Sequence, residues 1–273
     1  MFGANVSDRV SVSAICTSRQ SLQEDLSFWD RHGIDRVGIA YRKLGRGDAQ
    51  RIADQGLRVT SLLGLGTELD KRETWQLFRT EIQQMFEDAL TMKAEYVVLT
   101  SGSAGELPWE IAGERLAELL SVIAEDSGGV FPVPLLLEHT NQLRFDISFV
   151  HTLHDAIDLV RTLGLGVVME INACWLERAL SSTIASGMDV ISLVQVSDTK
   201  RGVRCTPERA VPGDGVIPIA RILGDLMKAS YKGAFELEFV GESIESEGYE
   251  KAVPRALEVF KRLLADASFG SQI

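Results

Sequence analysis

The feature that most constrains this chain is a regular alternation of short apolar runs with longer amphipathic stretches. Continuous apolar runs separated by helices indicate a parallel sheet that is buried on both faces. Eight such units in 273 residues predict one α/β domain, a (β/α)8 TIM barrel spanning residues 1–273. The predicted strands are 10–17, 36–40, 57–64, 95–100, 133–138, 166–171, 190–196 and 234–239.

The intervening stretches carry apolar residues at helical spacing. The predicted helices start near Leu22 and then cover 48–55, 70–93, 108–124, 149–163, 176–185, 219–229 and 249–265. Residues 197–218 form the longest predicted loop. No GxGxxG motif follows the first strand, so a dinucleotide-binding fold is not expected.

Charge and cysteine content narrow the class of partner and the compartment. Lys and Arg number 28 against 39 Asp and Glu, so the net charge is −11 and no nucleic-acid partner is expected. No apolar run approaches the roughly 20 residues of a spanning helix, and the first ten residues do not resemble a signal peptide. Cys16, Cys174 and Cys205 form no CxxC pair, which is typical of the reducing cytoplasm. We therefore expect a cytoplasmic protein without a membrane partner.

Four predicted strands end in oxygen-bearing side chains, at the barrel face where active sites lie. Glu138, Glu170, Gln195 and Glu238 stand at or near the ends of strands five to eight. A single Glu at such a place more often pairs with Lys or Arg, or reaches solvent. Four on consecutive strands favour a shared polar site.

A divalent cation resolves the cost of burying these carboxylates and their mutual repulsion. Oxygen ligands without His or Cys favour Mg or Mn over Zn or Cu. Glu138, Glu170, Gln195 and Glu238 are therefore the candidate ligands of one Mn or Mg ion.

Several motifs, taken in order, resemble the xylose-isomerase-like TIM-barrel superfamily of sugar phosphate isomerases and epimerases, over nearly the whole chain. The motifs are Leu-Leu-Glu138-His-Thr-Asn141, Glu170 with Ala173, Gln195 with Asp198 and Arg201, Pro212-Gly213-Asp214-Gly215, and Ser230-Tyr231-Lys232-Gly233 followed by Glu238. The resemblance implies a metal-dependent enzyme acting on a small polyhydroxylated carbonyl compound, in which Glu138 and Glu238 are also the catalytic acid and base. It further suggests a homodimer or homotetramer.

Three positions depart from the family pattern. Glu170 stands where the family has Asp, Gln195 replaces a metal-binding His, and Ala173 replaces a substrate-contacting His. Gln at this position is similar to the metal-dependent 3-dehydroshikimate dehydratases of the same superfamily. The alternatives to an isomerase or epimerase are therefore a dehydratase and a metal-free accessory or binding barrel.

The isomerase and dehydratase hypotheses share their first step. One Glu removes the proton α to a metal-polarised carbonyl, which gives an enediolate. An isomerase or epimerase returns a proton to another face or carbon, whereas a dehydratase expels a β-hydroxyl.

Further polar or aromatic residues near the strand ends are candidate substrate contacts. They are His139, Asn141, Asn172, Trp175, Asp198 and Arg201. In the long loop, Arg209 and Asp214 suggest a lid or, more simply, an ion pair within the loop.

Overall fold

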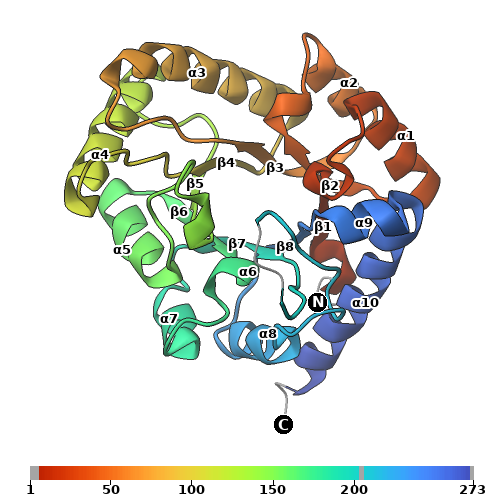
Figure 1. Cartoon of the computed structure of the whole chain (residues 1–273). Helices are drawn as coiled ribbons and strands as arrows, with labels where there is room; N and C mark the ends of the chain where they lie inside the picture. The colour runs from red at the N-terminus through yellow and green to blue at the C-terminus, as the bar shows by residue number, and fades with distance from the viewer. Residues whose placement is uncertain (1–5, 203–205, 271–273) are drawn as a thin grey trace.

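The computed structural model describes residues 6–202 and 206–270, and it shows one closed barrel of parallel strands (Figure 1). Each strand pairs with the next along the chain, and β8 closes the barrel against β1. The strands are β1 (Val10–Ser13), β2 (Arg36–Ala40), β3 (Arg58–Gly64), β4 (Tyr96–Thr100), β5 (Leu135–Glu138), β6 (Gly166–Glu170), β7 (Ile191–Val196) and β8 (Ala234–Leu237). The predicted (β/α)8 barrel is confirmed.

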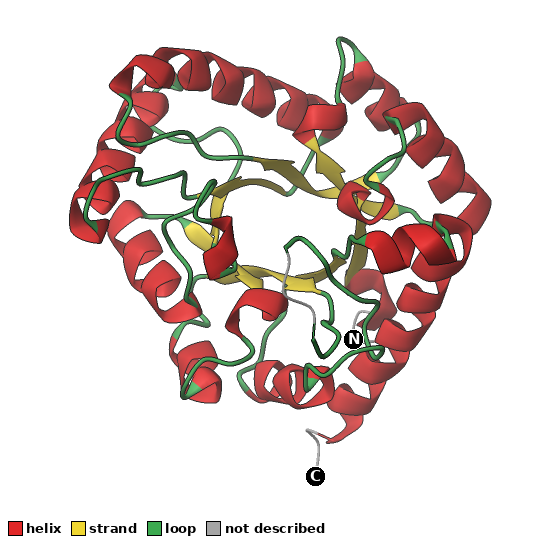
Figure 2. Cartoon of the chain, viewed as in Figure 1, coloured by secondary structure: helices red, strands yellow, loops and turns green. Residues whose placement is uncertain are grey.

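Helices surround the barrel, as Figure 2 shows. They are α1 (Leu22–His32), α2 (Asp48–Asp54), α3 (Trp75–Met92), α4 (Trp109–Asp126), α5 (Leu153–Leu163), α6 (Ile171–Cys174), α7 (Leu180–Ser186), α8 (Ile219–Lys228), α9 (Glu242–Glu247) and α10 (Tyr249–Gly270). Two short ones, α6 and α9, follow strand ends where the sequence pattern predicted no helix. Short 3-10 turns cover Val6–Arg9, Ala14–Thr17, Tyr41–Lys43, Arg72–Thr74 and Gln142–Arg144.

Several predicted element boundaries shift by a few residues, and two of these shifts have a clear local cause. The first strand ends at Ser13 because the Ser13 hydroxyl accepts a hydrogen bond from the Ile15 backbone N–H, at 3.2 Å, and begins a 3-10 turn. Helix α3 begins at Trp75, because the 3-10 turn at Arg72–Thr74 precedes it. Neither change alters the order of strands and helices.

Two apolar layers follow from the alternation of side chains along the strands. The large core lies between the sheet and the helices, while a small separate cluster fills the barrel interior. That interior cluster consists of Val98, Leu136, Val168, Leu193 and Ala234, with Leu63 and Tyr96 packed against it. Two residues further along their strands from Leu136, Val168 and Leu193 come Glu138, Glu170 and Gln195. The same alternation that places apolar side chains inside the barrel therefore places these polar ones inside, nearer the carboxyl ends.

Within the described ranges, no helix combines the length and apolar character that a membrane span requires. Cys16 and Cys174 are buried free thiols. Cys205 and residues 1–5 lie outside the described residues. The prediction of free thiols depends in part on Cys205, and the prediction that there is no signal peptide depends in part on residues 1–5.

Candidate active site

Strand register brings the polar side chains of β6, β7 and β8 to one level. Glu170 pairs with Gln195, and Gln195 pairs in turn with Glu236 on β8. All three side chains are fully or almost fully buried. Gln195 also reaches one step higher on β8, where its Nε2 donates a hydrogen bond to Glu238 Oε2 at 2.8 Å. The barrel therefore joins residues that are far apart in the sequence into one polar cluster.

Arg209, from the loop after β7, supplies a positive charge to this cluster. Its Nη2 lies 2.8 Å from Glu170 Oε2, and its Nη1 lies 3.0 Å from Glu238 Oε1 and 3.1 Å from the Glu238 carbonyl oxygen. The Arg209 side chain is only 14% exposed. Burial disfavours its charge, but Glu170 and Glu238 more than offset that effect and hold the pKa of Arg209 above its ordinary value.

Glu138 has a different environment from Glu238, although both are buried. Within residues 6–202 and 206–270, no hydrogen bond or ion pair to the Glu138 carboxyl group is found. Burial, and then the nearby charges of Glu238 and Glu170, raise the pKa of Glu138 well above the usual range. The Glu238 carboxyl group, by contrast, accepts hydrogen bonds from Arg209 and Gln195.

The environment of the Glu170 carboxyl group is intermediate between those of Glu138 and Glu238. Burial is the largest influence on this carboxyl group and raises its pKa to about 7, against the opposing charge of Arg209. Only Glu170 Oε2 contacts Arg209, and Oε1 is buried without a hydrogen-bond partner. The backbone N–H of Glu170 donates to His139 Nε2 at 3.2 Å.

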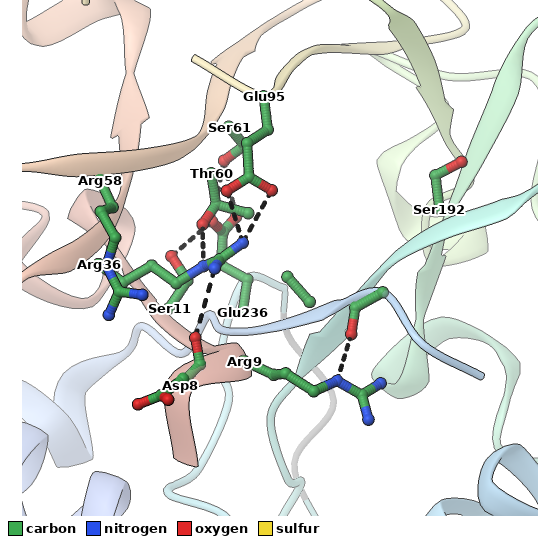
Figure 3. Close-up of polar contacts among 12 residues, drawn as sticks. Asp8, Arg9, Ser11, Arg36, Arg58, Thr60, Ser61, Glu95, Ser192 and Glu236 are labelled. Atoms are coloured by element: carbon green, nitrogen blue, oxygen red, sulfur yellow. Dashed lines mark hydrogen bonds and ion pairs between the residues drawn. The ribbon is translucent and has the colours of Figure 1, made fainter. Parts of the chain in front are cut away.

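A fourth carboxyl group, Glu236, lies within β8, two residues before Glu238, and Figure 3 shows it beside Ser11 and Ser61. Ser61 Oγ donates to both of its oxygens at 2.9 Å, and Ser11 Oγ donates to Oε2 at 3.2 Å. A Cβ atom at Gly38 would lie 2.2 Å from Glu236 Oε2, so glycine leaves the space that this carboxyl group fills. Burial raises the pKa of Glu236 to about 7, with a further contribution from the charge of Glu238. The sequence pattern did not single out Glu236.

A pocket of about 260 Å³ opens above the cluster. Glu138 lines it from the end of β5, Glu238 from the position just after β8, and Arg209 from the β7–α8 loop. Polar side chains from the loops after the strands complete the wall; they include Thr140, Asn141, Arg144, Asn172, Thr199 and Glu208. The pocket thus has buried carboxyl groups beneath a polar rim, an arrangement suited to a small molecule with several hydroxyl groups.

The donor atoms of the cluster fit a hard divalent cation. Glu170 Oε1 and Gln195 Oε1 are buried acceptors without a partner, and Glu138 is a third oxygen-bearing group. Oxygen acceptors of this kind suit Mg or Mn. Among the described side chains, however, no three His, Cys, Asp or Glu residues are already placed to hold one ion. The four side chains therefore carry donor atoms that suit such an ion. One oxygen each of Glu170 and Glu238 is, however, already paired with Arg209.

The structure divides the predicted substrate contacts into two groups. Asn141 and Asn172 line the pocket, where Asn141 Oδ1 also accepts from the Leu143 backbone N–H and Asn172 Nδ2 donates to the Asp198 carbonyl oxygen. His139 is fully buried outside the pocket lining, and burial lowers its pKa to about 3. Trp175 is half-buried and packs against the hydrophobic core.

The predicted contacts on the β7–α8 loop differ in exposure. Asp198 is buried, and its carboxylate accepts four backbone N–H hydrogen bonds at 2.8–3.0 Å from the loop that follows. These contacts give Asp198 the role of organising the loop. Arg201 is exposed and does not line the pocket. A substrate contact by either residue stays a prediction.

The predicted ion pair between Arg209 and Asp214 is wrong. Asp214 pairs with Arg255 of α10 at 2.9 Å, whereas Arg209 turns inward to Glu170 and Glu238. The chain folds back between Asp198 and Ala210, which form an antiparallel bridge, and this carries Arg209 over the barrel. The one sequence signal that could have pointed to Arg209 as a site residue is its position, three residues before Pro212 of the Pro-Gly-Asp-Gly motif.

Comparison with known proteins agrees with this architecture. The sequence pattern of the xylose isomerase-like TIM barrel family matches residues 29–263. No curated protein sequence matches the chain.

Three solved structures share the fold at low sequence identity. Protein SMc04130 from Sinorhizobium meliloti 1021 is 20% identical, with a TM-score of 0.78 over 96% of this chain and 98% of that one. The IolI protein with a bound zinc atom is 18% identical, with a TM-score of 0.77 over 95% and 98%. An L-ribulose 3-epimerase is 20% identical, with a TM-score of 0.76 over 97% of each chain. The matched sequence pattern covers most of the barrel, and the chain therefore belongs to the xylose isomerase-like TIM barrel family.

Proposed function

We propose that this protein is a divalent-metal-dependent isomerase or epimerase that acts on a small sugar or sugar phosphate. The observation that carries the proposal is the contrast between Glu138 and Glu238. Both are buried and line one pocket, yet Glu138 is unpaired with a raised pKa, whereas Glu238 accepts hydrogen bonds from Arg209 and Gln195. Two carboxyl groups held in different environments can serve as an acid and a base in one site.

The two groups take complementary roles in this proposal. The Glu238 carboxylate accepts the proton from the carbon next to the substrate carbonyl, and the hydrogen bond from Gln195 Nε2 orients it. Glu138 is the second acid–base group and returns a proton to the resulting enediolate. Glu138 ends β5 and Glu238 directly follows β8, so the two groups reach the pocket from separate strand ends, which suits return of the proton to another face or carbon.

The proposed metal ligands are Glu138, Glu170 through Oε1, Gln195 through Oε1, and Glu238. When bound, a Mn or Mg ion supplies Lewis-acid polarisation of the substrate carbonyl. Asn141 and Asn172 line the pocket and offer hydrogen bonds to substrate hydroxyl groups. The epimerase and the zinc-binding protein among the structural neighbours support this class of chemistry.

A metal-content measurement on the purified protein tests the proposal first. After dialysis, mass spectrometry of the wild-type protein should find about one equivalent of Mn or Mg per chain. Glu138→Gln and Glu238→Gln should both lose it, while Glu110→Gln, a change at an exposed residue of α4, should retain it. A wild-type protein that binds neither ion, and whose melting temperature does not move when Mn is added, would refute the metal-dependent proposal.

Deuterium exchange then separates the reaction classes. An isomerase or epimerase exchanges the hydrogen next to the carbonyl with D2O without losing water, and Glu238→Gln should abolish that exchange. Gln195 favours a second candidate, a dehydratase, which would instead give a conjugated product that absorbs ultraviolet light. An inert, metal-free protein would support an accessory barrel.

A further inference from the structure

The position of Arg209 has a consequence for how this site takes up a cation. Its guanidinium group lies between Glu170 Oε2 and Glu238 Oε1, at 2.8 and 3.0 Å, and its side chain is largely buried. These are two of the four side chains that we propose as metal ligands. A planar guanidinium group with several N–H donors can hold two carboxylates at once.

We propose that Arg209 is the resident counter-cation of the site and competes with the divalent metal ion for Glu170 and Glu238. In this arrangement Arg209 sets how tightly the metal ion binds. The inference rests on the proposed function, because it concerns the ion which that function uses.

The carboxyl groups of the cluster favour a cation at this place. Glu138, Glu170 and Glu238 are buried carboxyl groups, and Arg209 is the cation that contacts two of them in the described part of the chain. Buried carboxylates without a positive partner are strongly disfavoured. The guanidinium group therefore stabilises the metal-free protein, and a metal ion that takes its place gains less free energy than it would at unpaired carboxylates.

The oxygen atoms that remain free define the first step of the exchange. Glu170 Oε1 and Gln195 Oε1 are buried and have no hydrogen-bond partner among the described residues, so we expect an arriving ion to meet these acceptors before Arg209 moves. Glu170 Oε2 and Glu238 Oε1 become available only when the guanidinium group withdraws. Binding of the full ligand set is thus coupled to displacement of Arg209.

The backbone around Arg209 indicates that the exchange involves the side chain alone. The Arg209 N–H donates to the Val240 carbonyl oxygen at 2.8 Å, which ties the loop to the segment after β8. Its neighbour Ala210 exchanges two backbone hydrogen bonds with Asp198, at 2.8 and 2.9 Å. The exchange therefore requires a rotamer change of the Arg209 side chain and leaves these backbone hydrogen bonds in place.

Mn affinity, measured by titration calorimetry on metal-free full-length protein, tests the proposal. Arg209→Met removes the charge and keeps a long side chain, and it should bind Mn on the order of tenfold more tightly than the wild type. Arg209→Lys should fall between them, because an ammonium group lacks the fork that spans both carboxylates. The control is Arg255→Met: Arg255 also bridges two carboxylates, Asp214 and Glu247, but outside the barrel, and its loss should leave the affinity unchanged.

Thermal melting gives a second readout that does not depend on activity. Added Mn should raise the melting temperature of Arg209→Met more than that of the wild type, because a tighter ligand stabilises the folded state more at the same concentration. Circular dichroism checks that each variant is folded, and Arg209→Lys carries the test if Arg209→Met is not.

The outcomes separate this inference from the proposed function. If the wild type binds Mn and folded Arg209 variants bind it equally or more weakly, Arg209 is not a competitor, and the metal-dependent function stands. If neither the wild type nor the variants bind Mn or Mg, the metal-dependent function fails and the competition fails with it.

Discussion

Replacing Glu236 by Gln should stabilise the metal-free protein at alkaline pH. Gln keeps the shape of the side chain in the cradle of Ser11, Gly38 and Ser61 but cannot ionise. The hydroxyl groups of both serines can donate or accept, so they can serve the amide as well. What the change removes is the cost of ionising a carboxyl group in the barrel interior.

The structure gives the size and the sign of this effect. Burial raises the pKa of Glu236 from 4.5 to about 7, and each pKa unit corresponds to about 1.4 kcal/mol. Between these two pH values the folded wild type binds more protons than the unfolded chain, so its free energy of unfolding falls as pH rises. The Glu236→Gln variant has no ionisable group at this position, so this part of the fall in the free energy of unfolding does not occur in it. The variant should therefore exceed the wild type by about 3 kcal/mol above pH 7 and by little below pH 4.5.

Urea denaturation from pH 4.5 to 8.5, followed by circular dichroism with EDTA present, measures the difference. His139, whose pKa is lowered to about 3, and Glu170 titrate in both proteins and so largely cancel in the comparison. Equal dependence on urea concentration in the two proteins verifies that the same transition is compared. A stability difference that does not change with pH, or a variant less stable than the wild type at pH 8, would refute the reasoning.

Two other substitutions test the packing around the site. Asp198→Ala should destabilise the protein by about 3 kcal/mol or more and speed proteolysis within the β7–α8 loop, because backbone N–H groups, including those of Gly213 and Gly215, lose a buried acceptor; unchanged proteolysis would contradict a loop-organising role. Gly38→Ala should cost about 1–3 kcal/mol, because its Cβ would overlap Glu236. Glu236→Ala in the same chain should relieve most of that overlap, and purely additive losses in urea denaturation would contradict it.

The barrel itself was predictable from the sequence alone. Apolar runs such as Leu135–Leu137 alternate with amphipathic helices, and this periodicity specifies both the local structure and the buried faces. Because side chains alternate along a strand and active-site residues gather at the carboxyl ends, the same reading placed Glu138, Glu170, Gln195 and Glu238 in one polar layer. Their proposed roles stay predictions.

Tertiary structure decided what neutralises and surrounds those side chains. Strand register sets Gln195 beside Glu236, and the closed barrel brings Ser11 and Ser61 to the same carboxyl group. No local pattern specifies such contacts, because their partners lie on strands far apart in the chain.

Arg209 shows that a local sequence pattern does not specify the partner of a loop side chain either. Sequence proximity suggested Asp214 as its partner, but the fold of the β7–α8 loop carries its guanidinium group to Glu170 and Glu238. A loop side chain pairs with the charge that the fold brings within reach, and buried carboxylates attract it more strongly than a solvated one, since the surrounding dielectric is lower. Periodicity thus determined which side chains enter the barrel, and three-dimensional closure determined which charges they meet.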